Sequence, residues 1–266
     1  MKELIQKELS NIKEPKFKRL ALSEILQHLI LQSLNRNNAF KYLTFTGGTA
    51  LRLIYLTGRY SEDLDFSLTE KPDKKLEILF SSVQKDCIKQ NLKLELFQKE
   101  RKSIFTADLR FPEILQEFNL SPLKSQKLTI KIEIDKVPPK GGIEEIVLIT
   151  SPISYTVSVF NLSSLFATKL CAIFYRKYTK GRDYYDLMWL LGKKVIPNFK
   201  LLNNAINQVK PNVEKITEEN FKEKLNSHLL KIDFKKVKQE LERFLINENE
   251  LDFINYKSLA SLLNRY

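Results

Sequence analysis

The chain has 266 residues, of which 43% are hydrophobic and 29% are charged, a composition typical of a folded globular protein. Its 44 lysine and arginine residues against 32 acidic residues give a formal net charge of +12, which favours polyanionic partners such as nucleic acid. Two cysteines and two histidines exclude a disulfide scaffold and a Cys/His zinc cluster, and they argue against a histidine-based triad. The polar start and the lack of a long apolar run predict a cytoplasmic protein with no membrane segment.

Hydrophobic periodicity predicts alternating helices and strands up to about residue 160. Apolar residues between Leu22 and Ile30 recur three or four positions apart, which predicts a helix over about residues 17–36. A strand over 42–46 ends at Gly47-Gly48, and Thr49 opens the next helix. The elements expected after it are a strand at 64–68, a helix from Pro72 to about Gln90, and strands at 92–98, 103–110, 127–135, 144–149 and 155–160.

From Asn161 onward the pattern is helical throughout. We therefore predict an α+β fold with a core over residues 1–160, built of a mixed sheet with flanking helices, and a helical C-terminal lobe over residues 161–266. Because no flexible linker separates the two parts, we expect them to pack together around a cleft.

The glycine pair after the first strand is a candidate ligand site. Gly47 and Gly48 permit a tight turn and let backbone N–H groups approach a ligand closely. The start of a helix attracts anions, and the Thr49 hydroxyl adds a donor, so the turn suits a phosphate. An ordinary strand–turn–helix corner explains the same residues equally well. The chain contains no dinucleotide-binding fingerprint and no Walker A motif.

Asp63 and Asp65 are spaced to share one face of a strand, about 6.6 Å apart, while Leu64 and Phe66 face the core. At an effective dielectric constant of 20 the two charges repel by roughly 2–3 kcal/mol. A divalent cation relieves that repulsion, and Mg²⁺ prefers carboxylate oxygens together with substrate phosphates. The alternative is a solvated strand edge whose charges oppose aggregation.

A third acidic ligand is expected from the strand over residues 127–135. Its isoleucines alternate with polar residues, which places Glu133 and Asp135 together on the polar face. Either carboxylate could complete a metal site. We favour Glu133 because it lies mid-strand, and the alternative is a surface charge beside Lys131.

Two residues of the helical lobe are further candidates. Lys169 has apolar residues at all four neighbouring helical positions, so it either extends harmlessly to solvent or projects as a point charge for a nucleotide phosphate. Asp183 follows Gly181 and is placed to cap a helix. Residues 151–182 contain no acid but five cations, which adds positive charge beside the proposed site.

Over about residues 40–190 the chain resembles the AbiEii/AbiGii nucleotidyltransferase toxins, which include the MenT toxins. The resemblance rests on the joint order and spacing of Gly47-Gly48-Thr49-Ala50-Leu51-Arg52, Arg59-x-Ser61-x-Asp63-Leu64-Asp65-Phe66, Lys169, and Arg182-Asp183-x-x-Asp186-Leu187. It implies a DNA polymerase β-like nucleotidyltransferase core followed by a helical C-terminal lobe.

The resemblance also implies roles for individual residues. The catalytic residues would be Asp63, Asp65, Lys169 and Asp183, with Asp63 and Asp65 holding the metal. The resemblance does not fix the third acid, which stays Glu133 or Asp135. The nucleotide-binding residues would be Gly47, Gly48, Thr49, Arg52, Ser61 and Lys169.

The implied activity is that of a toxin from a toxin–antitoxin or phage-abortive system. Such an enzyme uses Mg²⁺, or Mn²⁺, to transfer a nucleoside monophosphate from an NTP to an RNA acceptor, with the tRNA 3′ end as the expected target, and it has a possible cognate antitoxin. The alternatives are transfer to a protein or small-molecule hydroxyl, or a non-catalytic nucleic-acid-binding module.

Overall fold

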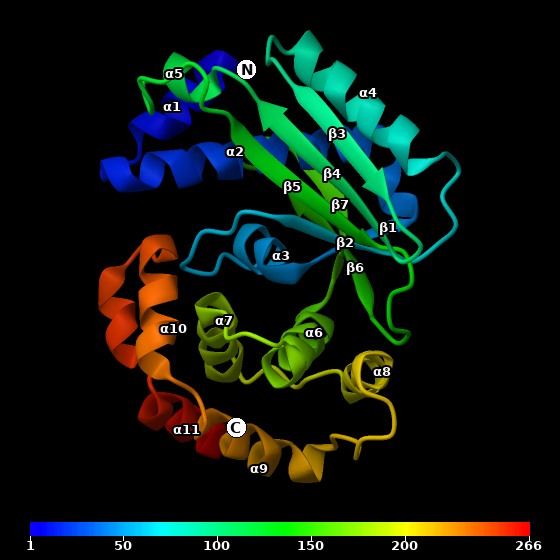
Figure 1. The fold of residues 1–266 in the computed structure, drawn as a ribbon, viewed down its shortest axis with the longest axis vertical. Helices are drawn as coiled ribbons and strands as arrows, with labels where there is room; N and C mark the ends of the chain where they lie inside the picture. Colours follow the sequence, from blue (N-terminus) through cyan, green and yellow to red (C-terminus); the bar gives the residue numbers. More distant parts are fainter. The chain divides into compact units, whose positions relative to one another are not determined.

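The computed structural model describes all 266 residues, which form two compact units (Figure 1). The first, here called the sheet unit, comprises Met1–Ala50, Tyr60–Val137 and Ile146–Val159. The second, here called the helical unit, comprises Leu51–Arg59, Pro138–Glu145 and Phe160–Tyr266. Two stretches before residue 160 thus pack with the helical unit, whereas a single boundary at residue 160 was expected.

The strands of the protein form one seven-stranded mixed sheet in the order β3-β4-β5-β2-β1-β7-β6. The antiparallel pairs include β1 with β2, and β4 with both β3 and β5. Strand β2 runs parallel to β5, and β1 runs parallel to β7. The strands are β1 (Leu43–Thr46), β2 (Leu64–Leu68), β3 (Glu95–Glu100), β4 (Ile104–Phe111), β5 (Leu128–Asp135), β6 (Glu144–Ile149) and β7 (Tyr155–Phe160).

The core of the sheet unit forms where apolar strand faces meet amphipathic helices. Ile130, Ile132 and Ile134 of β5 are fully buried, because alternate residues of a strand point to the same face. Helix α2 packs against α1, α4 and β5. The helices that begin in this unit are α1 (Lys2–Ser10), α2 (Pro15–Arg36), a 3₁₀ turn at Ala39–Lys41, α3 (Gly47–Leu53), α4 (Leu76–Lys89) and α5 (Ile114–Glu117).

The helical unit is organised around α7, which packs against α6, α10 and α11. Polar side chains cap the first turns of its helices. Asn161 accepts a hydrogen bond from the Ser164 amide at the start of α6, and Thr217 caps α9 in the same way. The helices are α6 (Leu162–Tyr175), α7 (Gly181–Gly192), α8 (Phe199–Val209), α9 (Glu218–Leu229), α10 (Phe234–Leu241), α11 (Tyr256–Arg265) and 3₁₀ turns at Glu242–Phe244 and Glu248–Phe253.

The expected α+β class is confirmed, and most element positions agree with the periodicity to within two residues. Two boundaries were wrong. Helix α4 begins at Leu76 rather than at Pro72, because the polar segment before it forms bends and turns. Strand β3 begins at Glu95 rather than at residue 92, because Asn91 adopts a left-handed φ of 61° and turns the chain first. No helix has the length and apolar character needed to span a membrane.

Candidate active site

The second aspartate of the predicted pair lies directly against the glycine turn. Gly47 has a φ of +78°, and a Cβ atom built there would lie 2.3 Å from Asp65 Oδ2. The neighbouring strands set this contact, since Thr46 is the register partner of Asp65 in the antiparallel β1–β2 pair. Gly47 is therefore required twice over, by its backbone conformation and by the approach of the carboxylate.

Buried polar side chains hold the loop that carries Asp63. The Thr49 hydroxyl is buried and hydrogen-bonds the Ser61 hydroxyl at 2.8 Å, and the Asp63 carbonyl oxygen also accepts from it. Gln27 of α2, fully buried, donates through Nε2 to the carbonyl oxygens of Ser61 (3.0 Å) and Glu62 (2.9 Å). The Thr49 hydroxyl is thus used inside the protein, and its predicted contact with a triphosphate stays a prediction.

Strand β5 places one of the two candidate third acids beside Asp65. In the parallel β2–β5 pair, Asp65 is the register partner of Glu133, whereas Asp135 is opposite Ser67. Burial raises the pKa of the Asp135 carboxyl, which accepts a hydrogen bond from the Val137 amide at 2.9 Å. The register therefore favours Glu133 as the neighbour of the aspartate pair.

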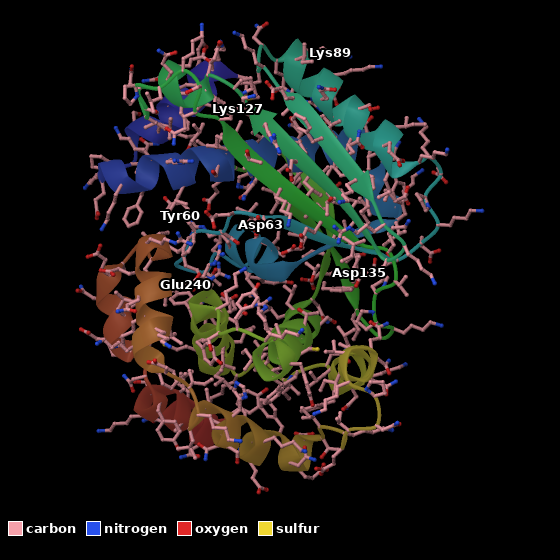
Figure 2. The ribbon with its side chains drawn as sticks, in the orientation of Figure 1. Tyr60, Asp63, Lys89, Lys127, Asp135 and Glu240 are labelled. Atoms are coloured by element: carbon pink, nitrogen blue, oxygen red, sulfur yellow. The ribbon has the colours of Figure 1, made fainter.

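Lys131 lies among the acidic side chains near β2 and β5, and their negative charge affects its pKa. Its ammonium forms an ion pair with Glu133, and that hydrogen bond, with added contributions from the charges of Glu133, Asp63 and Asp108, raises the pKa of Lys131. Asp63 therefore acts electrostatically on the same side chain that binds Glu133. Figure 2 labels Asp63 on the segment that enters β2.

The oxygen donors suit a hard divalent cation, although no three His, Cys, Asp or Glu side chains are already gathered to hold a metal. Asp63 and Asp65 are only partly buried, which is compatible with a cation reaching them from solvent. A Mg²⁺ ion commonly uses one or two carboxylates and takes its remaining ligands from phosphates and water. The residues present therefore fit such an ion, with Glu133 available once it leaves Lys131.

The helical unit gathers the other two predicted catalytic residues. Lys169 Nζ lies 2.9 Å from Asp183 Oδ1 and 2.8 Å from Asp186 Oδ2, and its side chain is 11% exposed. Burial lowers the pKa of Lys169, but the two carboxylates outweigh it and the pKa lies above its ordinary value. Burial raises the pKa of Asp183, but the charges of Lys169 and Arg176 outweigh it and hold the pKa below its ordinary value. Both groups are therefore charged.

The expectation that Asp183 caps a helix was wrong. Helix α7 begins at Gly181 with Lys180 as its N-cap, so Asp183 lies inside the first turn. Its carboxylate binds Lys169 and Arg176 instead of the free amides at the helix start. Two cations offer a carboxylate stronger hydrogen bonds than neutral amides do.

A second buried ion pair was not predicted from the sequence. Arg59 and Asp186 are 1% and 0% exposed, and the guanidinium donates through Nε at 2.7 Å and through Nη2 at 2.5 Å to the two carboxylate oxygens. The backbone of Arg59 is held by a β-bridge to Leu245. Asp186 therefore orients two cations at once, Arg59 and Lys169.

Among the remaining predicted residues, Gly48 is the partly buried second residue of α3. Arg52, from the same helix, donates through Nη1 to the Thr57 carbonyl oxygen at 2.7 Å. Their predicted roles in nucleotide binding stay predictions. The sheet unit thus brings together Gly47, Ser61, Asp63, Asp65 and Glu133, and the helical unit brings together Lys169 and Asp183.

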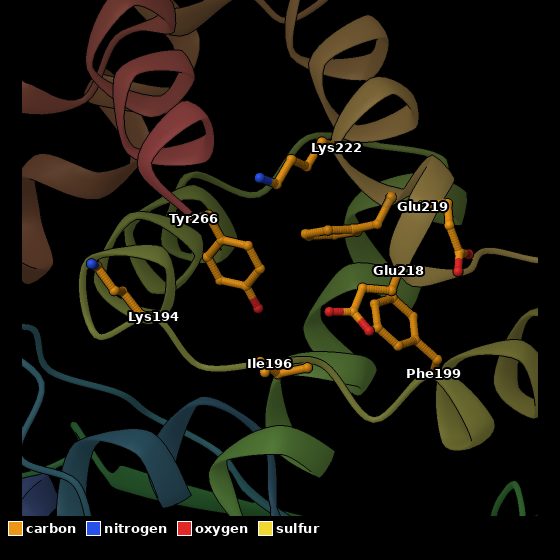
Figure 3. A pocket seen from close by; sticks show the side chains of 8 residues that line it. Lys194, Ile196, Phe199, Glu218, Glu219, Lys222 and Tyr266 are labelled. Atoms are coloured by element: carbon orange, nitrogen blue, oxygen red, sulfur yellow. The ribbon is translucent and has the colours of Figure 1, made fainter.

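The helical unit also contains a pocket of about 400 Å³ that includes none of these residues (Figure 3). Aromatic and charged side chains share its lining, with the Phe221 ring centroid 5.9 Å from that of Phe199 and 5.8 Å from that of Tyr266. The lining residues are Lys194, Ile196, Phe199, Glu218, Glu219, Phe221, Lys222 and Tyr266.

The mixed sheet, the glycine turn against Asp65 and the acidic face of β2 and β5 are the features expected of a nucleotidyltransferase. The fold is similar to that of a candidate nucleotidyltransferase from H. pylori, with a TM-score of 0.54 and 22% identity over 91% of this chain and 92% of that one. It is also similar to JHP933 from Helicobacter pylori, with a TM-score of 0.50 and 21% identity over 93% of this chain and 91% of that one.

The chain matches the family model described as nucleotidyl transferase AbiEii toxin, type IV toxin–antitoxin system, over residues 29–260. It belongs to that family, which confirms the resemblance seen in its motifs. Membership implies use of an NTP and a cognate antitoxin. No curated protein sequence matches the chain at a significant level.

The close approach at Gly47 predicts the cost of adding a side chain there. Gly47→Ala should lower the free energy of unfolding by about 1–3 kcal/mol, because the methyl group meets the Asp65 carboxylate and the φ of +78° disfavours an L-residue. Gly192→Ala is the control, since a Cβ there meets nothing within 4 Å. Urea unfolding measures the free energy of unfolding of both variants. Equal values for Gly47→Ala and Gly192→Ala would contradict the observed contact.

The buried pair predicts a large penalty for removing its acid. Asp186→Ala leaves Arg59 buried without its carboxylate and should cost about 3–5 kcal/mol. Glu214→Ala removes the exposed partner of Lys224 in the same unit and should cost less than about 1 kcal/mol. Chemical denaturation measures both, and the interpretation fails if Asp186→Ala is no more destabilising than Glu214→Ala.

Proposed function

We propose that this nucleotidyltransferase transfers a nucleoside monophosphate from an NTP to a hydroxyl of an RNA acceptor, with the tRNA 3′ end as the target. The acceptor oxygen forms a bond to the α-phosphorus, the bond from that phosphorus to the bridging oxygen breaks, pyrophosphate leaves with the electron pair, and the proton of the acceptor hydroxyl passes to solvent. The family membership supports the transfer, and the net charge of +12 supports a polyanionic acceptor.

One observation carries the proposal: the Asp65 carboxylate lies against Gly47, with Glu133 beside it on β5. This arrangement supports binding of a divalent cation, Mg²⁺ in our proposal, by Asp63 and Asp65, with Glu133 as a further ligand. Such an ion would activate the attacking hydroxyl and neutralise charge on the phosphates. The backbone N–H groups of Gly47 and Gly48 would approach the triphosphate at the turn.

The protein's own residues would divide the remaining tasks. Ser61 and Thr49 hold the loop that orients Asp63. Lys169 would donate to a nucleotide phosphate, and Asp183 would keep Lys169 charged and in place. Arg52 would add positive charge to nucleotide binding.

Labelled NTP incubated with Mg²⁺ and total tRNA tests the proposal. The wild type should label tRNA with at least one of the four nucleotides, and Asp63→Asn should reduce the rate at least about a hundredfold because it loses a metal ligand. Asp73→Asn, an exposed acid of the same unit, should retain the wild-type rate.

Label on a protein or small molecule instead of RNA would replace the acceptor in the proposal. The absence of label on every acceptor with every nucleotide would contradict enzymatic transfer and would favour a nucleic-acid-binding module.

Lys169 has its own test. Lys169→Ala should raise the KM for NTP or lower kcat about tenfold or more, since a charged hydrogen bond to phosphate is worth about 1.5–3 kcal/mol. Lys210→Ala removes an exposed lysine of the same unit and should leave both constants unchanged. Near-UV circular dichroism verifies that Lys169→Ala is folded, and unchanged kinetics in the folded variant would leave Lys169 a purely structural partner of Asp183 and Asp186.

A further inference from the structure

The connection between α6 and α7 carries exposed side chains that the transfer chemistry does not use. Residues 176–179 are all exposed, and Tyr178 is 67% exposed. We propose that this connection, residues 176–180, binds the single-stranded 3′ end of the RNA acceptor. One base stacks on the Tyr178 ring, and Lys177 and Lys180 hold the adjoining phosphates. The inference rests on the proposed function, because it assigns the site that would receive the acceptor.

The local charge favours a polyanion. Residues 151–182 contain no acid. Neither Lys177 nor Lys180 forms an ion pair, whereas Arg176 pairs with Asp183. Burial and then the charge of Arg182 lower the pKa of Lys180. The Asp183 carboxylate opposes this shift, and Lys169 and Arg176 add to it, so three cations and one acid act on this lysine. A nucleic-acid phosphate would relieve that repulsion.

The aromatic ring gives the connection more than charge. The Arg176 guanidinium carbon lies over the Tyr178 ring, 5.6 Å from its centre, and Tyr178 is nevertheless 67% exposed. Single-stranded nucleic acids bind where cations flank exposed aromatic rings, because every base has a face that can stack. Inside a duplex both faces of each base are stacked on neighbouring bases, so the ring favours a single strand.

The connection is joined to the candidate catalytic residues of the helical unit. Arg176, which lies beside the Tyr178 ring, also binds the Asp183 carboxylate, and Asp183 binds Lys169 at 2.9 Å. A base stacked on Tyr178 would therefore lie one side chain away from Asp183. This continuity favours an acceptor strand over a remote anion.

A second exposed ring in the same unit provides a matched control. Phe253 is 60% exposed, but its segment contains Glu248, Glu250 and Asp252. An acidic surrounding repels RNA, so this ring should contribute nothing to RNA binding.

The experiment measures affinity directly, without NTP. The probe is a short fluorescent single-stranded RNA with a free 3′ hydroxyl, and fluorescence anisotropy gives its dissociation constant. Tyr178→Ala should weaken binding about tenfold, whereas Tyr178→Phe and Phe253→Ala should stay within about twofold of the wild type. Lys177→Gln should reduce the slope of log affinity against log salt by about 0.7, the loss of one phosphate contact. A blunt duplex of the same sequence should bind with no dependence on Tyr178.

Kinetics separate this inference from the proposed function. In the transfer assay Tyr178→Ala should raise the KM for RNA and leave the KM for NTP unchanged. The inference is overturned if Tyr178→Ala binds the single strand as well as the wild type does, if Phe253→Ala weakens binding equally, or if the KM for NTP rises instead. A wild type that binds the RNA through Tyr178 but releases no pyrophosphate with any NTP would contradict the transfer and leave the RNA site standing.

Discussion

The Asp65 carboxylate lies so close to the Cα of Gly47 that no side chain fits between them, and the sheet unit is arranged around this contact. The β1–β2 register brings Asp65 beside the turn, and the β2–β5 register brings Glu133 beside Asp65. The Thr49 hydroxyl then ties the Asp63 backbone to the same turn. Negative charge is thus concentrated beside the glycine turn. That concentration is unfavourable by itself, and a divalent cation with a triphosphate would relieve it.

In the helical unit, by contrast, buried cations stay charged because carboxylates lie beside them. Lys169 is stable there because Asp183 and Asp186 outweigh the cost of burial, and Arg59 in turn balances Asp186. Such a network adds little stability compared with apolar packing, but breaking any one pair is expensive. Its value lies in fixing where each charge points, so that Lys169 is held in one position on α6.

Local patterns predicted the elements well because alternation and helical periodicity depend on neighbouring residues. The isoleucines of β5 and the apolar stripe of α2 are buried as their spacing indicates. The spacing also indicated that Glu133 and Asp135 share a face, but only the strand register shows that Glu133 is the one beside Asp65.

Contacts between distant segments left no such signal. Arg59 and Asp186 are 127 positions apart, and nothing local marks them as partners. Gln27 did leave a weak trace, as a polar residue within an apolar helical stripe. In the proposed active site, one divalent cation joins the two aspartates to the substrate. A crystal structure with Mn²⁺ and a non-hydrolysable NTP should give an anomalous peak about 2.1 Å from carboxylate oxygens of both Asp63 and Asp65 and from a nucleotide phosphate. Nucleotide bound with no peak at these two carboxylates would contradict it.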